Sequence, residues 1–295
     1  MNNTLMGAAD IGGSHITAAL VEAETGMVLH NTWQRNMVPA TGTVDEIIDA
    51  WSRVITGCYV HQHSKPVKWG IAMPGPFDYE SGISYIRGQN KYDALYGLNV
   101  KMLLADKLGI KKETIHFTND AACFLQGEVV AGAAMSMNEV IGLTLGTGLG
   151  SATFQNGKVL DAGWWSMPFR EGIAEDYLST RWFTKRYREL SGNTIDNVRQ
   201  LLEVSDRLLL QNIFNEFGHN LGHFLLQAIS QERIQLVVLG GNIAQTFHLF
   251  EKALLHCLTQ AGSNTSVKPA VLGEQAALIG AAAAAMEEQE VHAGK

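Results

Sequence analysis

Two glycine-rich turns between apolar, strand-like runs are the features that most constrain the fold of this chain. The first turn is Gly12-Gly13-Ser14, and the second is Gly146-Thr147-Gly148. Glycine lets backbone N–H groups approach an anion without interference from a Cβ atom. A single turn of this kind would say little, because glycine turns between strands are common. Two of them, far apart in the chain, predict two half-molecules that hold the phosphates of a nucleotide from opposite sides.

Length and charge narrow the class of protein. A chain of 295 residues exceeds the usual size of a single hydrophobic core, so we expect two domains with a cleft between them. A hydrophobic content of 46% with 17% charged residues is typical of a soluble globular protein rather than a disordered one. The net charge of −7 argues against nucleic acid as a main partner.

The sequence pattern also bears on the compartment. The most apolar stretch, residues 276–286, is alanine-rich and too short to span a bilayer, and the first residues lack the pattern of a signal peptide. Cys58, Cys123 and Cys257 are widely separated and offer neither a disulfide framework nor a CxxC metal motif. We therefore expect a reduced, cytoplasmic protein with no membrane partner.

The spacing of apolar residues predicts a similar series of elements twice. In the first half we expect a strand meander over residues 6–33, helices over 44–59, 99–108 and 121–134, strands over 67–72 and 115–118, and Thr43 as the first N-cap. In the second half we expect a hairpin over 140–155, a strand from 158, helices between 173 and 230 with a break at 191–193, a strand over 236–239, and helices over 243–258 and 276–288. This repetition predicts an α/β protein with duplicated halves that divide near residues 117–120.

Asn119-Asp120 follows a short strand and precedes an alanine-rich helix. Open α/β sheets bind ligands at the carboxyl ends of their strands, where a carboxylate could take a proton from a hydroxyl nucleophile. The same dipeptide is also a normal helix start, in which a side chain caps the first turn. On these residues alone the cap is the favoured interpretation.

Asp10 ends the first expected strand, next to the first glycine turn. A carboxylate there could hold Mg²⁺ through water, because Mg²⁺ keeps several of its waters and takes few protein carboxylates. The alternative is a buried turn aspartate that accepts hydrogen bonds from backbone amides.

Five ordered motifs cover nearly the whole chain. They are Asp10-Ile-Gly-Gly-Ser-His15, Met73-Pro-Gly-Pro-Phe-Asp78, Asn119-Asp120-Ala-Ala, Leu145-Gly-Thr-Gly-Leu-Gly150 and Leu239-Gly-Gly-Asn242. In this order they resemble the ROK family of sugar kinases, part of the actin-like, hexokinase-type ATPase superfamily. The resemblance implies an α/β fold of two actin-like (ribonuclease H-like) domains around a central cleft. We expect the domains to cover residues 1–118, joined by a C-terminal helix over 276–295, and residues 119–275.

The resemblance also implies an activity. Relatives phosphorylate a hexose with ATP and Mg²⁺, so we expect glucose or a related hexose, such as an N-acetylhexosamine, as the substrate and its 6-hydroxyl as the acceptor. It further implies a homodimer. The family also contains repressors with an added N-terminal helix-turn-helix. Because the first glycine turn lies within about a dozen residues of the first methionine, the kinase branch is favoured.

Carried onto this chain, the resemblance assigns roles to single residues. Asp120 is the general base, and Asp10 holds Mg²⁺. The ATP-binding set is Gly12, Gly13, Ser14, Gly146, Thr147 and Gly148, with Gly240, Gly241 and Asn242 on the adenosine side. The sugar-binding set is Gly75, Asn90, Asn119, Asp120 and Glu175. On the residues alone, Gly240-Gly241 is equally consistent with a tight strand-to-helix connection. His15 could touch phosphate, although a lone strand histidine is more often a plain surface or core residue.

One segment departs from the family pattern. Relatives usually carry a Gly-Glu-x-Gly-His segment and then a cysteine-rich zinc knuckle, whereas this chain has Gly163-Trp164-Trp165-Ser166-Met167 and no cysteines there. Structural zinc needs about four N or S ligands, so we expect no zinc. Glu175 then remains the candidate for the anomeric end of the sugar. For the two tryptophans, packing in the shortened loop is favoured over a platform beneath a sugar ring.

The altered loop keeps a second function open, a sugar-binding regulator with a degenerate active site. The intact Asp10, Asp120 and both glycine turns favour the enzyme. His219 and His223 have the i, i+4 spacing of a metal pair but no obvious third ligand, so a helix face at solvent or at an interface is favoured for them.

Overall fold

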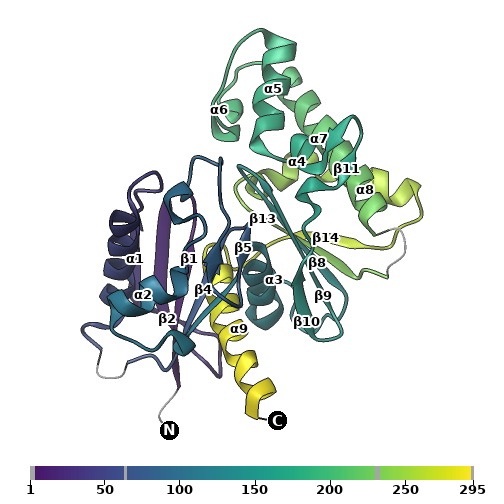
Figure 1. Cartoon of the computed structure of the whole chain (residues 1–295). Helices are drawn as coiled ribbons and strands as arrows, with labels where there is room; N and C mark the ends of the chain where they lie inside the picture. The colour runs from purple at the N-terminus through teal and green to yellow at the C-terminus, as the bar shows by residue number, and fades with distance from the viewer. Residues whose placement is uncertain (1–3, 63–64, 230–232, 294–295) are drawn as a thin grey trace. The chain divides into compact units, whose positions relative to one another are not determined.

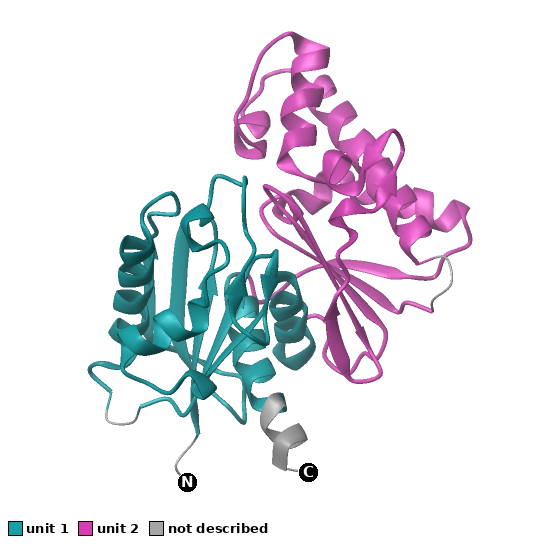
Figure 2. Ribbon diagram, in the orientation of Figure 1, with its two compact units in different colours: residues 1–132, 274–295 teal, residues 133–273 magenta. Residues whose placement is uncertain are grey.

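The computed structural model describes residues 4–62, 65–229 and 233–293, which form two compact units (Figures 1 and 2). Unit 1 comprises residues 1–132 and 274–295, and unit 2 comprises residues 133–273. The division differs from the expected one after residue 118, because helix α3 (Asp120–Ala131) packs against α9 (Gln275–Ala293) within unit 1. No helix in the described ranges is both long and apolar enough to cross a membrane.

Unit 1 is built on a five-stranded sheet in the order β3-β2-β1-β4-β7. Its strands are β1 (Leu5–Ile11), β2 (His15–Glu22), β3 (Val28–Met37), β4 (Trp69–Met73) and β7 (Ile115–Asn119), and a small hairpin of β5 (Phe77–Asp78) and β6 (Ile83–Ser84) follows β4. Strands β1 to β3 form the expected antiparallel meander, whereas β1, β4 and β7 run parallel. The register places Asp10 opposite Thr17 on β2 and Ala72 on β4.

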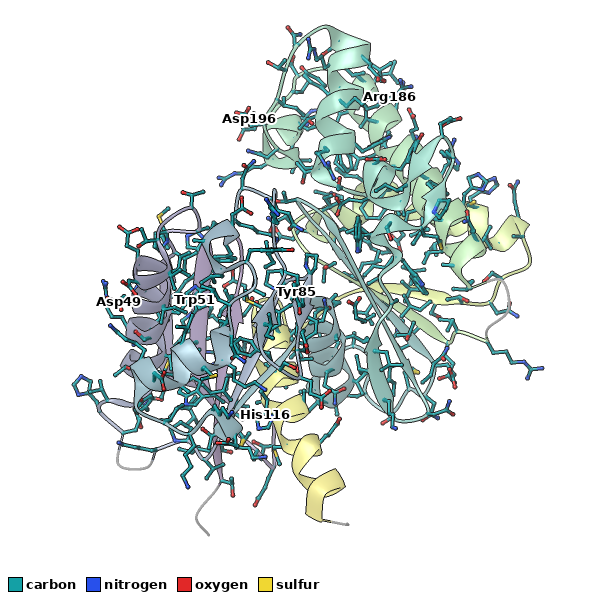
Figure 3. All side chains as sticks on the ribbon, in the orientation of Figure 1. Asp49, Trp51, Tyr85, His116, Arg186 and Asp196 are labelled. Carbon is teal, nitrogen blue, oxygen red and sulfur yellow. The ribbon has the colours of Figure 1, made fainter. Side chains whose placement is uncertain are left out.

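Helices cover both faces of this sheet (Figure 1). Helices α1 (Val44–Tyr59) and α2 (Val100–Leu108) bury one face, and α3 and α9 bury the other. The short 3₁₀ turns are η1 (Asp93–Leu95) and η2 (Lys112–Thr114). The core on the α1 side includes the fully buried Trp51 (Figure 3). Thr43 caps α1 in a capping box with Glu46, which confirms the expected N-cap.

Unit 2 repeats the sheet of unit 1 in the order β10-β9-β8-β13-β14. Its strands are β8 (Val140–Leu145), β9 (Leu149–Gln155), β10 (Lys158–Asp161), β13 (Leu236–Gly240) and β14 (Ser266–Pro269). Again the first three strands are antiparallel and the last two run parallel to the first, so the prediction of duplicated α/β halves is confirmed. The sequence does not predict β14, because its four residues show no alternation of apolar and polar side chains. In the structure only Val267 of the four is buried.

The helices of unit 2 lie where they are expected, with small differences at their ends. They are α4 (Ala174–Leu178), α5 (Thr180–Ser191), α6 (Val198–Leu202), α7 (Arg207–Ala228) and α8 (Phe247–Gln260), with 3₁₀ turns η3 (Trp164–Ser166) and η4 (Ala244–Thr246) and a hairpin of β11 (Pro168–Phe169) and β12 (Gly172–Ile173). Gly192, with a φ of +73°, ends α5 at the expected break. A core rich in phenylalanine packs these helices together.

Candidate active site

The first glycine turn joins β1 to β2 in unit 1. The Gly12 N–H donates to the His15 carbonyl (2.9 Å), and the buried Tyr92 hydroxyl donates to the Gly12 carbonyl (2.5 Å). In the part of the chain that the structure describes, the N–H groups of Gly13 and Ser14 have no protein acceptor. Consecutive N–H groups without a partner can form a concave site for an anion. This turn is therefore able to hold a phosphate oxygen.

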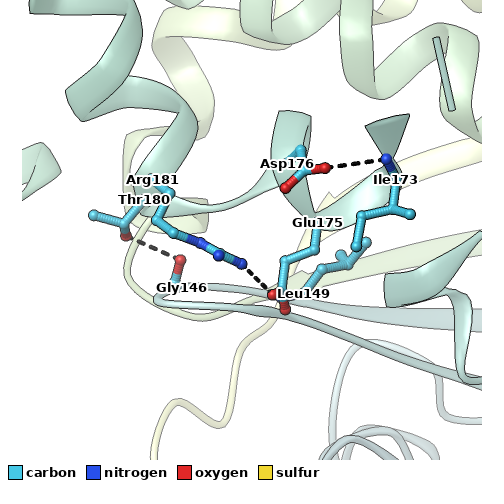
Figure 4. A network of polar contacts seen from close by, with 7 residues as sticks. All are labelled: Gly146, Leu149, Ile173, Glu175, Asp176, Thr180 and Arg181. Carbon is cyan, nitrogen blue, oxygen red and sulfur yellow. Dashed lines mark hydrogen bonds and ion pairs between the residues drawn. The ribbon is translucent and has the colours of Figure 1, made fainter. Parts of the chain in front are cut away.

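The second glycine turn joins β8 to β9 in unit 2, and Thr180 contacts its first residue, Gly146 (Figure 4). The Gly146 N–H donates to the Gly148 carbonyl (3.1 Å), and Thr180 donates to the Gly146 carbonyl from both its N–H (2.8 Å) and its Oγ1 (2.9 Å). Among the described residues, the N–H groups of Thr147 and Gly148 have no protein acceptor. Each unit thus carries one turn with two adjacent N–H donors left for a ligand.

Glu175 on α4 holds the end of the second turn (Figure 4). Its Oε2 accepts a hydrogen bond from Leu149 N–H (3.0 Å), and its Oε1 forms an ion pair with Arg181. A Cβ on Gly148 would lie 2.6 Å from that Oε2, so a larger residue at this position would displace the carboxylate from its present contacts. The Glu175 side chain remains 22% exposed, which leaves room for a ligand oxygen as well. The sequence gives no signal for this contact, which connects residues 26 positions apart.

Gly240, Gly241 and Asn242 end β13 next to the second glycine turn. Gly241 has a φ of +85°, and a Cβ there would collide with the Leu145 carbonyl oxygen. That carbonyl also accepts a hydrogen bond from Ile243 N–H (3.1 Å). The structure therefore brings this segment and the end of β8 together in unit 2, as a tight strand-to-helix connection that only glycine permits. The adenosine-side role of the segment stays a prediction.

Asn119 and Asp120 stand where β7 ends and α3 begins. Asn119 is the N-cap, since its Oδ1 accepts a hydrogen bond from Ala122 N–H (3.1 Å). Its Nδ2 donates to the Tyr79 hydroxyl (3.1 Å). Asp120 is the first helical residue, half-buried, and its Oδ1 accepts from Ala121 N–H (2.9 Å). The capping function therefore falls to Asn119, and the Asp120 carboxylate is not the cap of the helix.

Asp10 is half-buried at the end of β1, and other carboxylates act on it. Its pKa is raised from 3.8 to about 7, first by burial and then by the charges of Asp120 and Glu274, while the charge of Arg35 acts in the opposite direction. Arg35 in turn forms an ion pair with Glu274 (2.5 Å). The parallel register of β1, β4 and β7 places Asp10 and Asp120 at the same end of the unit 1 sheet, where the charge of Asp120 acts on the pKa of Asp10.

This arrangement fits a hydrated divalent cation. A positive charge near Asp10 would relieve the repulsion from Asp120 and return Asp10 to its ionised form. Within the described residues, no group of three His, Cys, Asp or Glu side chains is arranged as a direct metal-ligand set. Mg²⁺ does not need one, because it usually binds through one or two carboxylates, several waters and substrate phosphates.

The remaining sugar candidates of unit 1 lie in two places. Gly75 follows β4, and a Cβ on it would lie 3.3 Å from the Tyr79 hydroxyl, the same hydroxyl that Asn119 contacts. Gly75 and Asn119 are therefore neighbours around Tyr79. Asn90 is exposed, with a φ of +56°, two residues before the Tyr92 that contacts the first glycine turn. The structure thus groups Asn90 with the phosphate turn more directly than with Asn119.

The segment that replaces the family's usual loop forms a 3₁₀ turn and the β11–β12 hairpin. Trp164 packs against the unit 2 core, with its ring 6.2 Å from that of Phe224, as the packing interpretation predicts. Trp165 differs, since it remains 49% exposed. Arg170 at the hairpin turn lies over the rings of Phe169 (5.6 Å) and Tyr177 (5.8 Å). The hairpin is thus held by aromatic and cation–π contacts.

The histidine pair on α7 is exposed, as the sequence predicts. The Nδ1 atom of His223 lies 3.7 Å from the Cys257 sulfur on α8, and His219 lies one turn earlier on α7. This is a weak contact between two packed helices.

Comparison with known proteins identifies relatives across the whole chain. The model of the ROK family matches residues 6–163 and 170–288. An N-acetyl-D-glucosamine kinase of Mannheimia succiniciproducens is 25% identical, over 93% of this chain and 97% of its own length. A xylose repressor of Bacillus subtilis is 23% identical, over 92% of this chain and 74% of its own length.

Solved structures share the fold. A ROK family glucokinase from Streptomyces griseus, crystallised with glucose and AMPPNP, superimposes with a TM-score of 0.76 at 21% identity, over 96% of this chain and 99% of its own. A glucokinase from Parabacteroides distasonis gives a TM-score of 0.80 at 20% identity, over 97% of this chain and 98% of its own. At this level of identity the likeness establishes the architecture only, and it agrees with the two α/β units described above.

Proposed function

Because the chain belongs to the ROK family, we propose that it is a sugar kinase, which transfers the γ-phosphoryl group of ATP to a hydroxyl group of a hexose. The observation that carries this proposal is the electrostatic coupling of Asp10 and Asp120 at the end of the unit 1 sheet where the first glycine turn presents its free N–H groups. A coupled carboxylate pair beside an anion-binding turn suits phosphoryl transfer, which depends on positioning and charge stabilisation.

Asp120 is the general base of this proposal. A sugar hydroxyl is a poor nucleophile, and a positioned carboxylate that takes its proton contributes roughly 10²–10⁴ in rate. Asn119, fixed as the helix cap and bonded to Tyr79, keeps the start of α3 in place. We infer that Asn119, Gly75 and Asp120 contact the hydroxyls of the hexose, and that Glu175 contacts its anomeric end.

The glycine turns are the phosphate-binding elements. The N–H groups of Gly13 and Ser14 in unit 1, and those of Thr147 and Gly148 in unit 2, would each hold phosphate oxygens of ATP, with Gly241 on the adenosine side. Asp10, assisted by water, would hold Mg²⁺, which neutralises charge that develops on the transferred phosphoryl group. Fixed donors of this kind stabilise a transition state without reorganisation.

The acceptor is a hexose, either glucose or an N-acetylated hexosamine, phosphorylated at the 6-hydroxyl. The N-acetyl-D-glucosamine kinase and glucokinase relatives support this class without choosing a member of it. We expect the segment over residues 163–173, where this chain departs from the family pattern, to determine which hexose is bound.

The experiment that tests the proposal measures ADP release from ATP and Mg²⁺ with glucose, mannose and the N-acetylhexosamines in turn. We expect one hexose to stimulate release strongly, and we expect Asp120→Ala to lower kcat by about 10²–10⁴ while the melting temperature changes little. Wild-type turnover in the Asp120→Ala variant would contradict the assigned base.

A sugar-binding regulator is the second candidate function. The observations that favour it are the substituted loop at Gly163–Met167 and the similarity to a xylose repressor over most of this chain. A regulator would bind a hexose, as seen by calorimetry, and release no ADP with any member of the panel.

A further inference from the structure

A lysine outside the family motifs lies against the first glycine turn. A Cβ built on Gly13 would be 3.4 Å from the Cδ atom of Lys91, so the aliphatic part of Lys91 passes directly over the glycine. The ammonium group is two bonds beyond Cδ and therefore lies within reach of the same turn. Lys91 is half-buried, so its side chain is partly covered by the protein and does not simply extend into solvent.

The segment that carries Lys91 is fixed to the turn. Tyr92 is fully buried, packs edge-on against Trp51 (ring centroids 5.1 Å apart) and donates its hydroxyl to the Gly12 carbonyl (2.5 Å). Its N–H donates to the Ala40 carbonyl (2.6 Å). Asn90 and Tyr92 have φ values of +56° and +58°, which set the direction of the backbone on either side of Lys91. Because its neighbour is anchored, Lys91 is held beside Gly12-Gly13-Ser14.

The negative charges around the first glycine turn would repel a phosphate unless an unpaired cation lay beside it. Asp120 and Glu274, and Asp10 where it is ionised, place negative charge at this end of the sheet. Of the nearby basic groups, Arg35 is paired with Glu274, and the His15 ring nitrogen Nδ1 is hydrogen-bonded with the Ser14 hydroxyl (2.9 Å). Across the described ranges, Lys91 itself forms no ion pair or hydrogen bond. An incoming phosphate would otherwise meet mainly like charge.

We propose that Lys91 is a phosphate-binding residue of the first glycine turn, whose ammonium group pairs with a phosphate oxygen that the Gly13 and Ser14 N–H groups hold. This inference rests on the proposed function for the identity of the phosphate as that of ATP or ADP. A lysine is suited to the role, since its compact ammonium acts as a point charge on a flexible stem. The pair it forms is charge-assisted and is stronger than a neutral hydrogen bond.

The test compares ligand binding by Lys91→Met, Lys91→Arg and Lys112→Met, with Lys112 as an exposed lysine on η2 of the same unit. Calorimetry with ADP, adenosine and inorganic triphosphate separates the phosphate from the nucleoside. We expect Lys91→Met to weaken ADP and triphosphate binding about tenfold and to leave adenosine binding unchanged. Lys91→Arg should retain most of the affinity, and Lys112→Met should match the wild type.

Unchanged ADP affinity in Lys91→Met, or an equal loss for ADP and adenosine, would overturn the inference. So would a loss for ADP without one for triphosphate. Because binding is measured without turnover, the result is independent of whether any hexose is phosphorylated. Where a hexose is turned over, Lys91→Met should raise the KM for ATP and leave the KM for the sugar unchanged. Melting temperatures of all three variants identify any that fail to fold.

Discussion

At the scale of single residues, the raised pKa of the half-buried Asp10 has a consequence for stability. Its pKa is raised to about 7, first by burial and then by the charges of Asp120 and Glu274, while in the unfolded chain it stays near 3.8. A carboxyl group whose pKa is higher in the folded state than in the unfolded chain stabilises the fold. This contribution is fully present at pH values below the pKa of the unfolded chain. That contribution is lost as the pH rises through about 7, because ionised Asp10 must then be accommodated next to like charges.

We predict that Asp10→Asn has the stability of the wild type near pH 4 and exceeds it near pH 8. At about 1.4 kcal/mol per pKa unit the shift from 3.8 to about 7 corresponds to roughly 4 kcal/mol, and solvent screening of the half-buried carboxyl lowers the expected gain to about 2–4 kcal/mol. Urea unfolding at both pH values, without divalent cations, measures it. Asp106→Asn, at an exposed position of α2, is the control and should behave alike at both pH values. An equal gain from Asp10→Asn at pH 4 and pH 8 would contradict the electrostatic explanation.

Two adjacent residues show what sequence alone can and cannot decide. Asn119-Asp120 allows either a helix cap or a catalytic carboxylate, and the choice depends on which side chain turns back onto the helix. The structure gives the cap to Asn119, through its hydrogen bond to Ala122 N–H. The coupling of Asp120 to Asp10, 110 positions earlier, arises only when β1 and β7 lie in one sheet.

At the scale of elements, the hairpins and caps follow from local sequence, and the contacts that hold the second glycine turn do not. The β8–β9 hairpin and the Thr43 cap involve residues within a few positions of one another, so short patterns predict them. The contacts of Glu175 and Thr180 with residues 146–149 join α4 and α5 to a turn about 30 positions earlier. No spacing rule encodes such pairs.

We predict that the Glu175–Arg181 ion pair affects nucleotide binding through this turn. Arg181→Met frees the Glu175 carboxylate that accepts from Leu149 N–H and should loosen the turn. Because the Arg181 side chain is 63% exposed, we expect only about a two- to fivefold rise in the KM for ATP. Arg186→Met is the matched control, since Arg186 on the same helix pairs with Glu189 and Glu216 instead. Equal kinetic effects of the two variants would show that the turn does not depend on this pair.

At the scale of the whole molecule, unit 1 is completed by the last helix of the chain. Gly127 on α3 and Gly280 on α9 let the two helices meet at their backbones, because a Cβ on either would collide with a carbonyl of the other helix. Gly70 on β4 allows the same approach to Ala281. The alanine-rich sequences of α3 and α9 carry no clear amphipathic pattern. The sequence therefore does not predict that these two helices pack against each other in unit 1.

Unit 2 is continuous in sequence, whereas unit 1 needs two separate segments, and this difference predicts how fragments behave. Residues 133–273 contain a complete sheet and their own core, so we expect this fragment to unfold cooperatively on its own. Residues 1–132 lack α9, which covers β1, β4 and α3, and should not give a cooperative transition. Adding a peptide of residues 274–295, or fusing it to the fragment through a flexible linker, should restore one. Circular dichroism during heating measures each case, and a cooperative transition for residues 1–132 alone would mean that burial of these apolar faces by α9 is not required.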